Sequence, residues 1–214
     1  MRSLYLASQK RYLVEPVNTH TARLKATLLV TLGIGLLPIS ARAAGSEAIE
    51  KPVRTLISAV RYGRDALALT FLSGDQQSRL LLGADWNKGT AAQRSEFLAL
   101  FHKLFAAMAF PRIRADFEHL ETILYEAPKI DGDKAELGST LVILHPMKKQ
   151  EIKVRYALSR EKSWKVVDVT VLGDKSMLTN IRNDQVAPIL KEGGFPHLLD
   201  LMRKRAAELA QSAK

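Results

Sequence analysis

Residues 151–171 read EIKVRYALSREKSWKVVDVTV, and this stretch decides the fold. Apolar and charged side chains alternate over 151–159, which is the period of a β-strand with one buried face. The turn at 161–163 separates this strand from a second one over 164–171. A parallel crossover needs roughly a dozen residues or more, so the two strands must be antiparallel neighbours.

Two further strands precede this pair. Residues 117–126 and 135–144 have strand-like composition, and Asp131-Gly132-Asp133 between them is a hairpin-type turn. All connections in this region are short. The sequence therefore predicts a four-stranded antiparallel meander.

Helical periodicity comes before the sheet. Residues 47–62 carry apolar side chains at helical spacing and place Pro52 in the first turns, where a missing N–H costs least. A short helix should follow and end near Gly83. Residues 85–89 are predicted to form a loop.

A capping-box pattern, Thr90 with Gln93, predicts the start of a helix over 90–110 that Pro111 should end. After the sheet, helical spacing returns over 183–190 and over 195–210. The fold class is therefore α+β, with N-terminal helices, a four-stranded antiparallel curved sheet, and C-terminal helices packed on one face around an apolar cavity. Gly193-Gly194 should form the joint between the last two helices.

The N-terminal region has the three parts of a secretory signal peptide. Residues 26–39 are uncharged and largely apolar, basic residues precede them, and an A-x-A pattern follows at 41–43. We predict a cleaved signal peptide over 1–43, a single mature domain over 44–214 and a periplasmic location. The alternative is an uncleaved anchor, but the apolar segment is shorter than the roughly 20 residues needed to span a bilayer.

Charge and cysteine content narrow the possible functions. The chain has a net charge of +10 and no cysteine, which excludes disulfides, thiolate metal sites and cysteine nucleophiles. Residues 1–43 hold six basic residues and one acidic residue, so the mature chain keeps a net charge of +5. Its short basic clusters lack interleaved aromatic residues, and we expect no nucleic-acid partner.

The five histidines, the acidic residues and the serines form no recognisable catalytic or metal-binding motif. Only His119 has flanking acidic residues, and a solvated strand residue explains it. Asp131-Gly132-Asp133 lacks the rest of a calcium loop, and the sequence has no G-x-S-x-G motif. We therefore predict no catalytic residue, no metal and no cofactor.

Apolar side chains on one face of the helix and of the strands are the more informative feature. They predict either a filled core or the walls of a cavity, and periodicity does not distinguish the two. The candidate wall residues, chosen by the face that they occupy, are Phe97, Phe101, Leu104, Phe105, Met108, Val154, Tyr156, Leu158, Val167, Val169 and Val171.

Two segments carry a resemblance to a known family. Residues 82–97 read LGADWNKGTAAQRSEF, and residues 163–182 read SWKVVDVTVLGDKSMLTNIR. The first resembles the Leu-Gly, tryptophan and Thr-x-x-Gln-Arg-x-x-Phe pattern of the MlaC / toluene-tolerance family. The second resembles that family's Trp-Lys-x-x-Asp-Val run and the segment after it, with Ile181 and Gln185 where an aromatic residue is usual. The resemblance covers residues 46–210.

The resemblance implies a periplasmic phospholipid carrier that performs no chemistry. Such a carrier would shuttle one lipid between an outer-membrane lipoprotein complex and an inner-membrane ABC transporter complex. The acyl chains would lie in a cavity between the 90–110 helix, the C-terminal helices and the concave sheet face. The headgroup would remain at the mouth, where Arg182 is a candidate to meet the phosphate.

Three alternatives remain open from the sequence. The ligand could be another apolar lipid, such as a hopanoid-like molecule. The chain could be a periplasmic interaction module without a pocket. A small enzyme on a nuclear-transport-factor-like scaffold is the third alternative, by analogy of fold alone.

Overall fold

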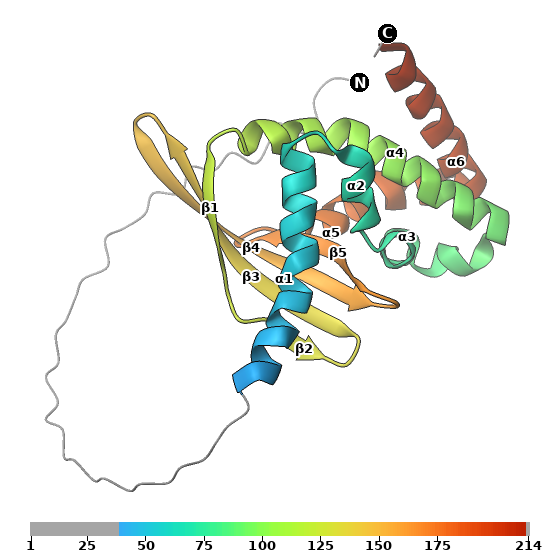
Figure 1. Cartoon of the computed structure of the whole chain (residues 1–214). Helices are drawn as coiled ribbons and strands as arrows, with labels where there is room; N and C mark the ends of the chain where they lie inside the picture. The colour runs from blue at the N-terminus through green and yellow to red at the C-terminus, as the bar shows by residue number, and fades with distance from the viewer. Residues whose placement is uncertain (1–38, 213–214) are drawn as a thin grey trace, which may run out of the picture. The chain divides into compact units, whose positions relative to one another are not determined.

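The computed structural model describes residues 39–212, so the predicted signal peptide lies almost wholly outside the described residues. The described chain is α+β, with helices before and after an antiparallel sheet (Figure 1). The helices before the sheet are α1 (Ile39–Arg61), α2 (Asp65–Thr70), α3 (Gly74–Leu82), the 3-10 helix η1 (Gly83–Lys88) and α4 (Ala91–Asp116). The strands are β1 (Leu120–Tyr125), β2 (Lys129–Asp131), β3 (Lys134–His145), β4 (Lys148–Arg160) and β5 (Trp164–Val171). The helices after it are α5 (Met177–Ile181), the π-helix η2 (Arg182–Val186) and α6 (Ala187–Ser212).

The predicted antiparallel meander is confirmed, with one addition. The strand order is β1-β3-β4-β5, and the short strand β2 also pairs with β3, so the sheet has five strands and not four. β1 pairs with the 139–143 part of β3, and β2 pairs with the 134–136 part of it. The two short strands therefore follow the same edge of β3. Pro128, which has no N–H to donate, lies where that edge is interrupted.

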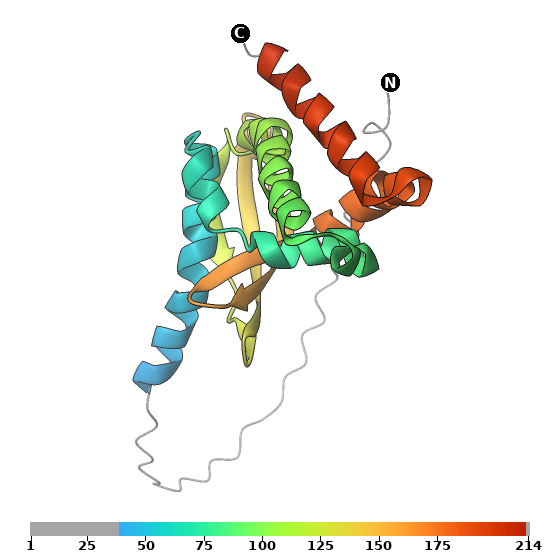
Figure 2. The ribbon, with the colours of Figure 1, turned by 90° about the vertical axis from the view of Figure 1, so that its right-hand side faces the viewer.

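One face of the sheet is apolar, as the alternation in 151–159 predicts. Tyr156 of β4 pairs with Leu137 of β3 and with Val169 of β5, so these three side chains share a face. Helix α1 lies against the sheet, as Figure 2 shows from the side. The opposite face carries charged side chains such as Arg155.

Two prolines were expected near helix ends and lie inside helices instead. α1 begins at Ile39, so Pro52 is in its interior, and α4 continues past Pro111 to Asp116. Each proline leaves the carbonyl four residues earlier without its helical N–H partner. These carbonyls belong to Ala48 and Ala107, which are exposed, so water can supply the missing hydrogen bond.

Of the predictions for helix ends and connections, some are confirmed and others are wrong. α3 ends at Leu82 as expected, while residues 85–89, predicted as a loop, are mostly in the 3-10 helix η1. The helix predicted over 183–190 begins as the π-helix η2. The joint at Gly193-Gly194 is confirmed, because Gly194 has a φ of 70° inside α6, a conformation that favours glycine.

Buried apolar side chains form two clusters. The sheet cluster joins α1 and the apolar sheet face; its main members are Ile49, Val53, Leu56, Ile57, Val60, Phe110, Leu137, Leu141, Val154, Tyr156, Leu158 and Val166. The helical cluster joins α3, η1, α4, α5, η2 and α6; its members are Leu81, Leu82, Trp86, Phe97, Phe101, Leu178, Val186, Phe195, Leu198 and Leu199. Within residues 39–212, no helix has the length and apolar character needed to cross a membrane.

Candidate functional site

A ladder of aromatic rings runs along α4 and links the two clusters. The ring of Phe97 stacks on that of Phe101 with centroids 6.1 Å apart, and it contacts the edge of Phe195 at 5.9 Å. Phe105 lies 5.7 Å from Phe101 and 5.4 Å from Phe110. Phe105 is half-buried and packs against both clusters, so it marks the place where they meet.

The start of α4 is fixed by its cap and by a close contact with α6. The predicted capping box is present: the Gln93 N–H donates to Thr90 Oγ1, and the Thr90 N–H donates to Gln93 Oε1. A Cβ atom on Gly89 would lie 2.3 Å from the Phe195 ring, so a larger residue in this turn would displace that ring.

β5 and α5 are tied together by one carboxylate. Asp168 Oδ1 accepts hydrogen bonds from the N–H of Val169 at 2.8 Å and from the N–H of Leu178 at 3.0 Å. Ser176 caps α5 by accepting from the N–H of Thr179. The chain thus passes from the sheet cluster, against which Val169 of β5 packs, to the helical cluster, to which Leu178 of α5 belongs.

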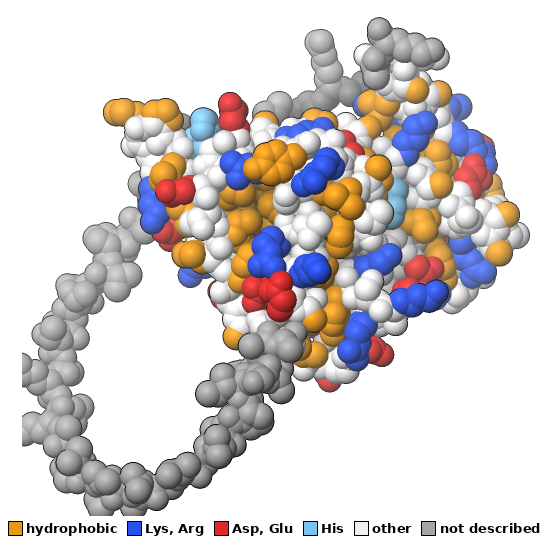
Figure 3. Space-filling view, in the orientation of Figure 1, with side chains coloured by type: hydrophobic (Ala, Val, Ile, Leu, Met, Phe, Trp, Pro, Cys, Tyr) orange, Lys and Arg blue, Asp and Glu red, His pale blue; other side chains and the backbone are white. Residues whose placement is uncertain are grey.

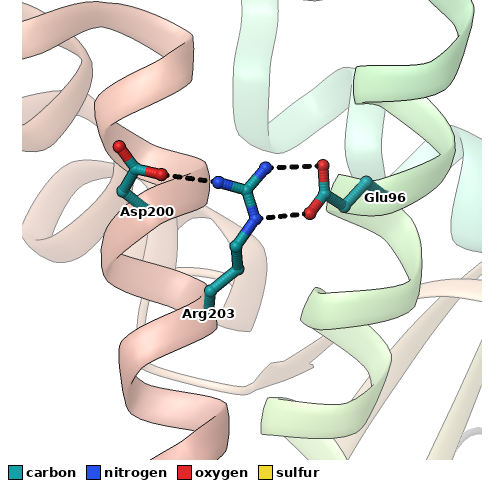
Figure 4. Close-up of polar contacts among 3 residues, drawn as sticks. All are labelled: Glu96, Asp200 and Arg203. Atoms are coloured by element: carbon teal, nitrogen blue, oxygen red, sulfur yellow. Dashed lines mark hydrogen bonds and ion pairs between the residues drawn. The ribbon is translucent and has the colours of Figure 1, made fainter.

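An ion pair holds α6 against α4 (Figure 4). The Arg203 guanidinium donates to both carboxylate oxygens of Glu96, at 2.6 and 2.8 Å, and to Asp200 at 2.5 Å. The hydrogen bond from Arg203 lowers the pKa of Glu96. All three side chains are exposed to solvent, so this contact orients the helices more than it stabilises them.

A polar bridge connects α3, α4 and β5. The Gln77 side-chain amide donates to the carbonyl of Val167 at 3.0 Å, and Gln77 Oε1 lies 3.3 Å from His102 Nε2. Burial, with the Lys165 ammonium as a second cause, lowers the pKa of His102. The bridge satisfies polar groups that would otherwise be buried without partners.

The predicted wall residues do not all surround one cavity. Phe97 and Phe101 belong to the helical cluster, and the three β4 residues Val154, Tyr156 and Leu158 belong to the sheet cluster. Val167 is buried.

We call the other five wall residues the junction. It consists of the half-buried Leu104, Phe105 and Val169 and the exposed Met108 and Val171. They belong to α4, which contributes to both clusters, and to β5, which contributes to the sheet cluster.

Arg182, the candidate for the headgroup, is exposed at the start of η2. Its guanidinium lies beside Gly83 at the end of α3, where a Cβ atom would come within 2.7 Å of Nη2. The structure therefore places Arg182 at the contact between α3 and η2, and its role toward a phosphate stays a prediction.

A pocket of about 830 Å³ lies between α3 and the end of the sheet that carries the β2–β3 hairpin. Of the predicted wall residues, Leu158 and Val167 line it. The other lining residues are Gln76, Leu80, Lys129, Ile130, Asp131, Asp133, Lys134, Ala135, Glu136, Ala157, Ser159, Arg160 and Glu161. The sequence analysis predicted only a turn at 131–133 in this part of the lining and did not assign 129–130 to a strand; the signal was Ile130, an apolar residue among charged ones.

Charged groups outside this pocket show little sign of a reactive centre. His119 and His145 contact each other with ring centroids 5.2 Å apart. Among the described residues, no group of three or more histidine and acidic side chains is arranged to hold a metal ion. Lys and Arg side chains are distributed over the face in Figure 3, with apolar and acidic side chains between them.

Comparison with known proteins identifies the family. A family model described as MlaC protein matches residues 65–204, more than half of the chain. The chain belongs to the MlaC family. The MlaC match runs from the start of α2 into α6. It therefore contains all five junction residues, while α1 lies before it. No curated protein matches the chain.

A solved structure has a similar fold. It is the phospholipid-binding protein from Ralstonia solanacearum, determined in complex with a phospholipid. The match has a TM-score of 0.60 and 16% sequence identity, and it covers 77% of this chain and 98% of that chain. At this identity the likeness shows that the MlaC-family chain and the Ralstonia protein share a fold.

The two motif tryptophans of this MlaC-family chain both lie under guanidinium groups. Arg79 and Arg94 lie 4.8 and 5.2 Å from the Trp86 ring, and Arg160 lies 5.1 Å from the Trp164 ring. Trp86 is a buried member of the helical cluster. These cation–π contacts help to hold the two motif tryptophans in place.

Proposed function

We propose that this chain binds one phospholipid and carries it through the periplasm without chemical change. Membership of the MlaC family and the fold shared with a protein solved with a phospholipid support this function. The chain would receive and deliver its lipid at an outer-membrane lipoprotein complex and an inner-membrane ABC transporter complex. A binding protein, and not an enzyme, is the class that these observations favour.

The observation that carries the proposal is the incomplete burial of the junction. Met108 is 45% exposed and Val171 is 43% exposed, although their elements also carry fully buried apolar residues, Phe97 on α4 and Val166 on β5. Phe105, between the two clusters, is also only half-buried. Acyl chains need apolar walls and no polar partner, so we place them here, between the sheet cluster and the helical cluster.

The energetics require a carrier of this kind. A two-chain lipid has about 30 methylenes, and exposing each to water costs roughly 0.8 kcal/mol, on the order of 25 kcal/mol in total. Free diffusion through water is therefore negligible. The carrier must bind the lipid about as well as a bilayer does, or it could neither load nor unload. Direction must then come from its partners.

The first test is extraction of the purified protein with organic solvent, followed by mass spectrometry. We expect about one phospholipid per chain. Recovery of a hopanoid-like or other apolar lipid would show that the ligand is not a phospholipid. A protein free of any lipid would refute the carrier function.

The junction is tested by adding charge there. Val171→Glu places a carboxylate where we expect acyl chains, and Val169→Lys places an ammonium group two residues earlier on the same strand. Because burying a charge among acyl chains is unfavourable, we expect at least a tenfold loss of retained lipid. Leu124→Glu is the matched control, since Leu124 is 57% exposed on β1 and outside the junction. Full lipid loading of a folded Val171→Glu protein would contradict the assignment.

A further inference from the structure

The hairpin between β3 and β4 ends beyond the other strands of the sheet. β1 pairs with β3 only as far as Ile143, and β5 pairs with β4 only from Val154 onward. We define the hairpin tip as residues 144–149, which read LHPMKK and are all exposed. Its printed contacts with the rest of the described chain lie at its base, where the Leu144 N–H donates to the carbonyl of His119. Figure 1 shows the hairpin extending past β1.

The hairpin tip combines apolar side chains with lysines. Met147 is 98% exposed and Leu144 is 42% exposed, and the exposed Pro146 lies between them in sequence. In Figure 3 the same corner of the molecule ends in apolar side chains. Lys148 and Lys149 follow directly. An apolar end beside basic residues is typical of segments that bind at the interface of an anionic membrane.

The positive charge lies at the end of the hairpin and the negative charge lies behind it. Lys149 pairs with Glu151 at 2.9 Å, whereas Lys148 makes no ion pair within residues 39–212. Glu151 and Glu121, the acidic groups that act on Lys149, lie on strands farther from the end. Because exposed charges are screened over about 8 Å at physiological salt, a surface that touches the hairpin tip senses the lysines most strongly.

The shape of the hairpin tip favours a lipid surface over a protein partner. A stable protein interface covers roughly 800 Å² and 20–30 residues on each side. Six residues at a projecting turn offer much less. A lipid surface needs only a small apolar end that enters the headgroup layer and basic groups that meet the phosphates.

The hairpin tip and the junction lie toward the same end of the sheet. Val154 of β4 pairs with the junction residue Val171, and Lys148 lies six residues before Val154, about 20 Å along the strand. Leu172, which follows Val171, is 46% exposed. A membrane that contacts the hairpin tip is therefore about 20 Å from this end of the junction.

We propose that the hairpin tip anchors the protein on membranes that contain anionic phospholipid, with Met147 in the headgroup layer and Lys148 and Lys149 at the phosphates. The inference rests on the proposed carrier function for its purpose, which is to keep the junction near the bilayer during loading and release. One apolar side chain and two lysines give weak, reversible binding, as a carrier that must leave again requires.

The test is flotation of the purified protein with vesicles of either phosphatidylglycerol or phosphatidylcholine. Each lysine near an anionic surface strengthens binding roughly fivefold, so we expect about tenfold or more preference for phosphatidylglycerol. Met147→Asp/Lys148→Glu removes the apolar end and reverses one charge, and it should lower binding to phosphatidylglycerol by about tenfold or more. Both residues are exposed, so the variant should unfold at the wild-type temperature.

The matched control is Ile130→Asp/Lys134→Glu, which makes the same changes of charge on the hairpin at the opposite end of β3. It should bind phosphatidylglycerol vesicles as the wild-type protein does. Absent wild-type binding, equal binding to the two kinds of vesicle, or an equal loss in both double variants would overturn the anchor and leave the carrier function in place. So would wild-type binding by Met147→Asp/Lys148→Glu, the result expected if the hairpin tip docks on a protein. Solvent extraction of the same samples reports separately on the carrier function, which a wild-type protein free of lipid would refute.

Discussion

The helical cluster and the sheet cluster are both buried, yet they are built in different ways. The helical cluster is closed by contacts that tolerate little change: stacked phenylalanines, a glycine pressed against Phe195 and a capping box. The sheet cluster is a layer of side chains under α1, and it contributes Ala135 and Leu158 to the pocket. Of the buried residues of the helical cluster, none lines that pocket.

We propose that the two clusters have different roles. The helical cluster fixes the position of α4, and the sheet cluster provides the surfaces that a ligand can reach. If so, substitutions in the helical cluster should change stability much more than ligand selectivity, whereas substitutions at the junction should do the reverse.

The largest expected effect is on stability, from Phe97→Ala. Phe97 is fully buried and contacts two other rings, so its removal leaves a cavity that neighbouring helices cannot fill. We expect the free energy of unfolding to fall by about 3–5 kcal/mol in urea denaturation. Met108→Ala on the same helix should change it by less than about 1 kcal/mol, because Met108 is exposed. Equal losses of unfolding free energy for Phe97→Ala and Met108→Ala would show that the helical cluster and the junction do not differ in their contribution to stability.

A smaller effect should come from Gly89→Ala. The backbone of Gly89, with φ −77° and ψ 147°, suits any residue, so the added methyl group acts only through its clash with Phe195. We expect a loss of about 1–3 kcal/mol in the free energy of unfolding. In a Phe195→Leu background the same change should be less harmful, and a double-mutant cycle measures the difference. Additive effects would show that the close contact is unimportant.

Sequence predicted the elements that short-range rules define. Alternation in 151–159 gave the apolar face, and Thr90 with Gln93 gave the start of α4, since both patterns depend on neighbouring residues. The helix ends near Pro52 and Pro111 were predicted wrongly. A proline is tolerated inside a helix when water can bind the carbonyl that loses its N–H partner, and the exposure of that carbonyl is a property of the folded surface.

The candidate site was harder to predict for a related reason. Periodicity places Phe97 and Phe105 on one face of a helix, but it does not say that one is enclosed and the other lies between two clusters. The charged pocket escaped notice because its lining comes from α3 and four strands, which approach only after folding.

The smallest expected effect concerns His102, whose bridge with Gln77 links the two regions. Its pKa in the folded protein is lowered by burial and by Lys165, whereas the unfolded chain should titrate near the ordinary value of about 6.5. The unfolded state therefore binds a proton more readily, so the stabilising contribution is present above about pH 6.5 and is lost as the pH falls through the folded pKa. The urea midpoint should thus drop more between pH 7.5 and pH 5 for the wild-type protein than for His102→Gln. The two proteins differ only at residue 102, so the difference between the two drops reports on His102; an identical drop would mean that the bridge does not sense pH.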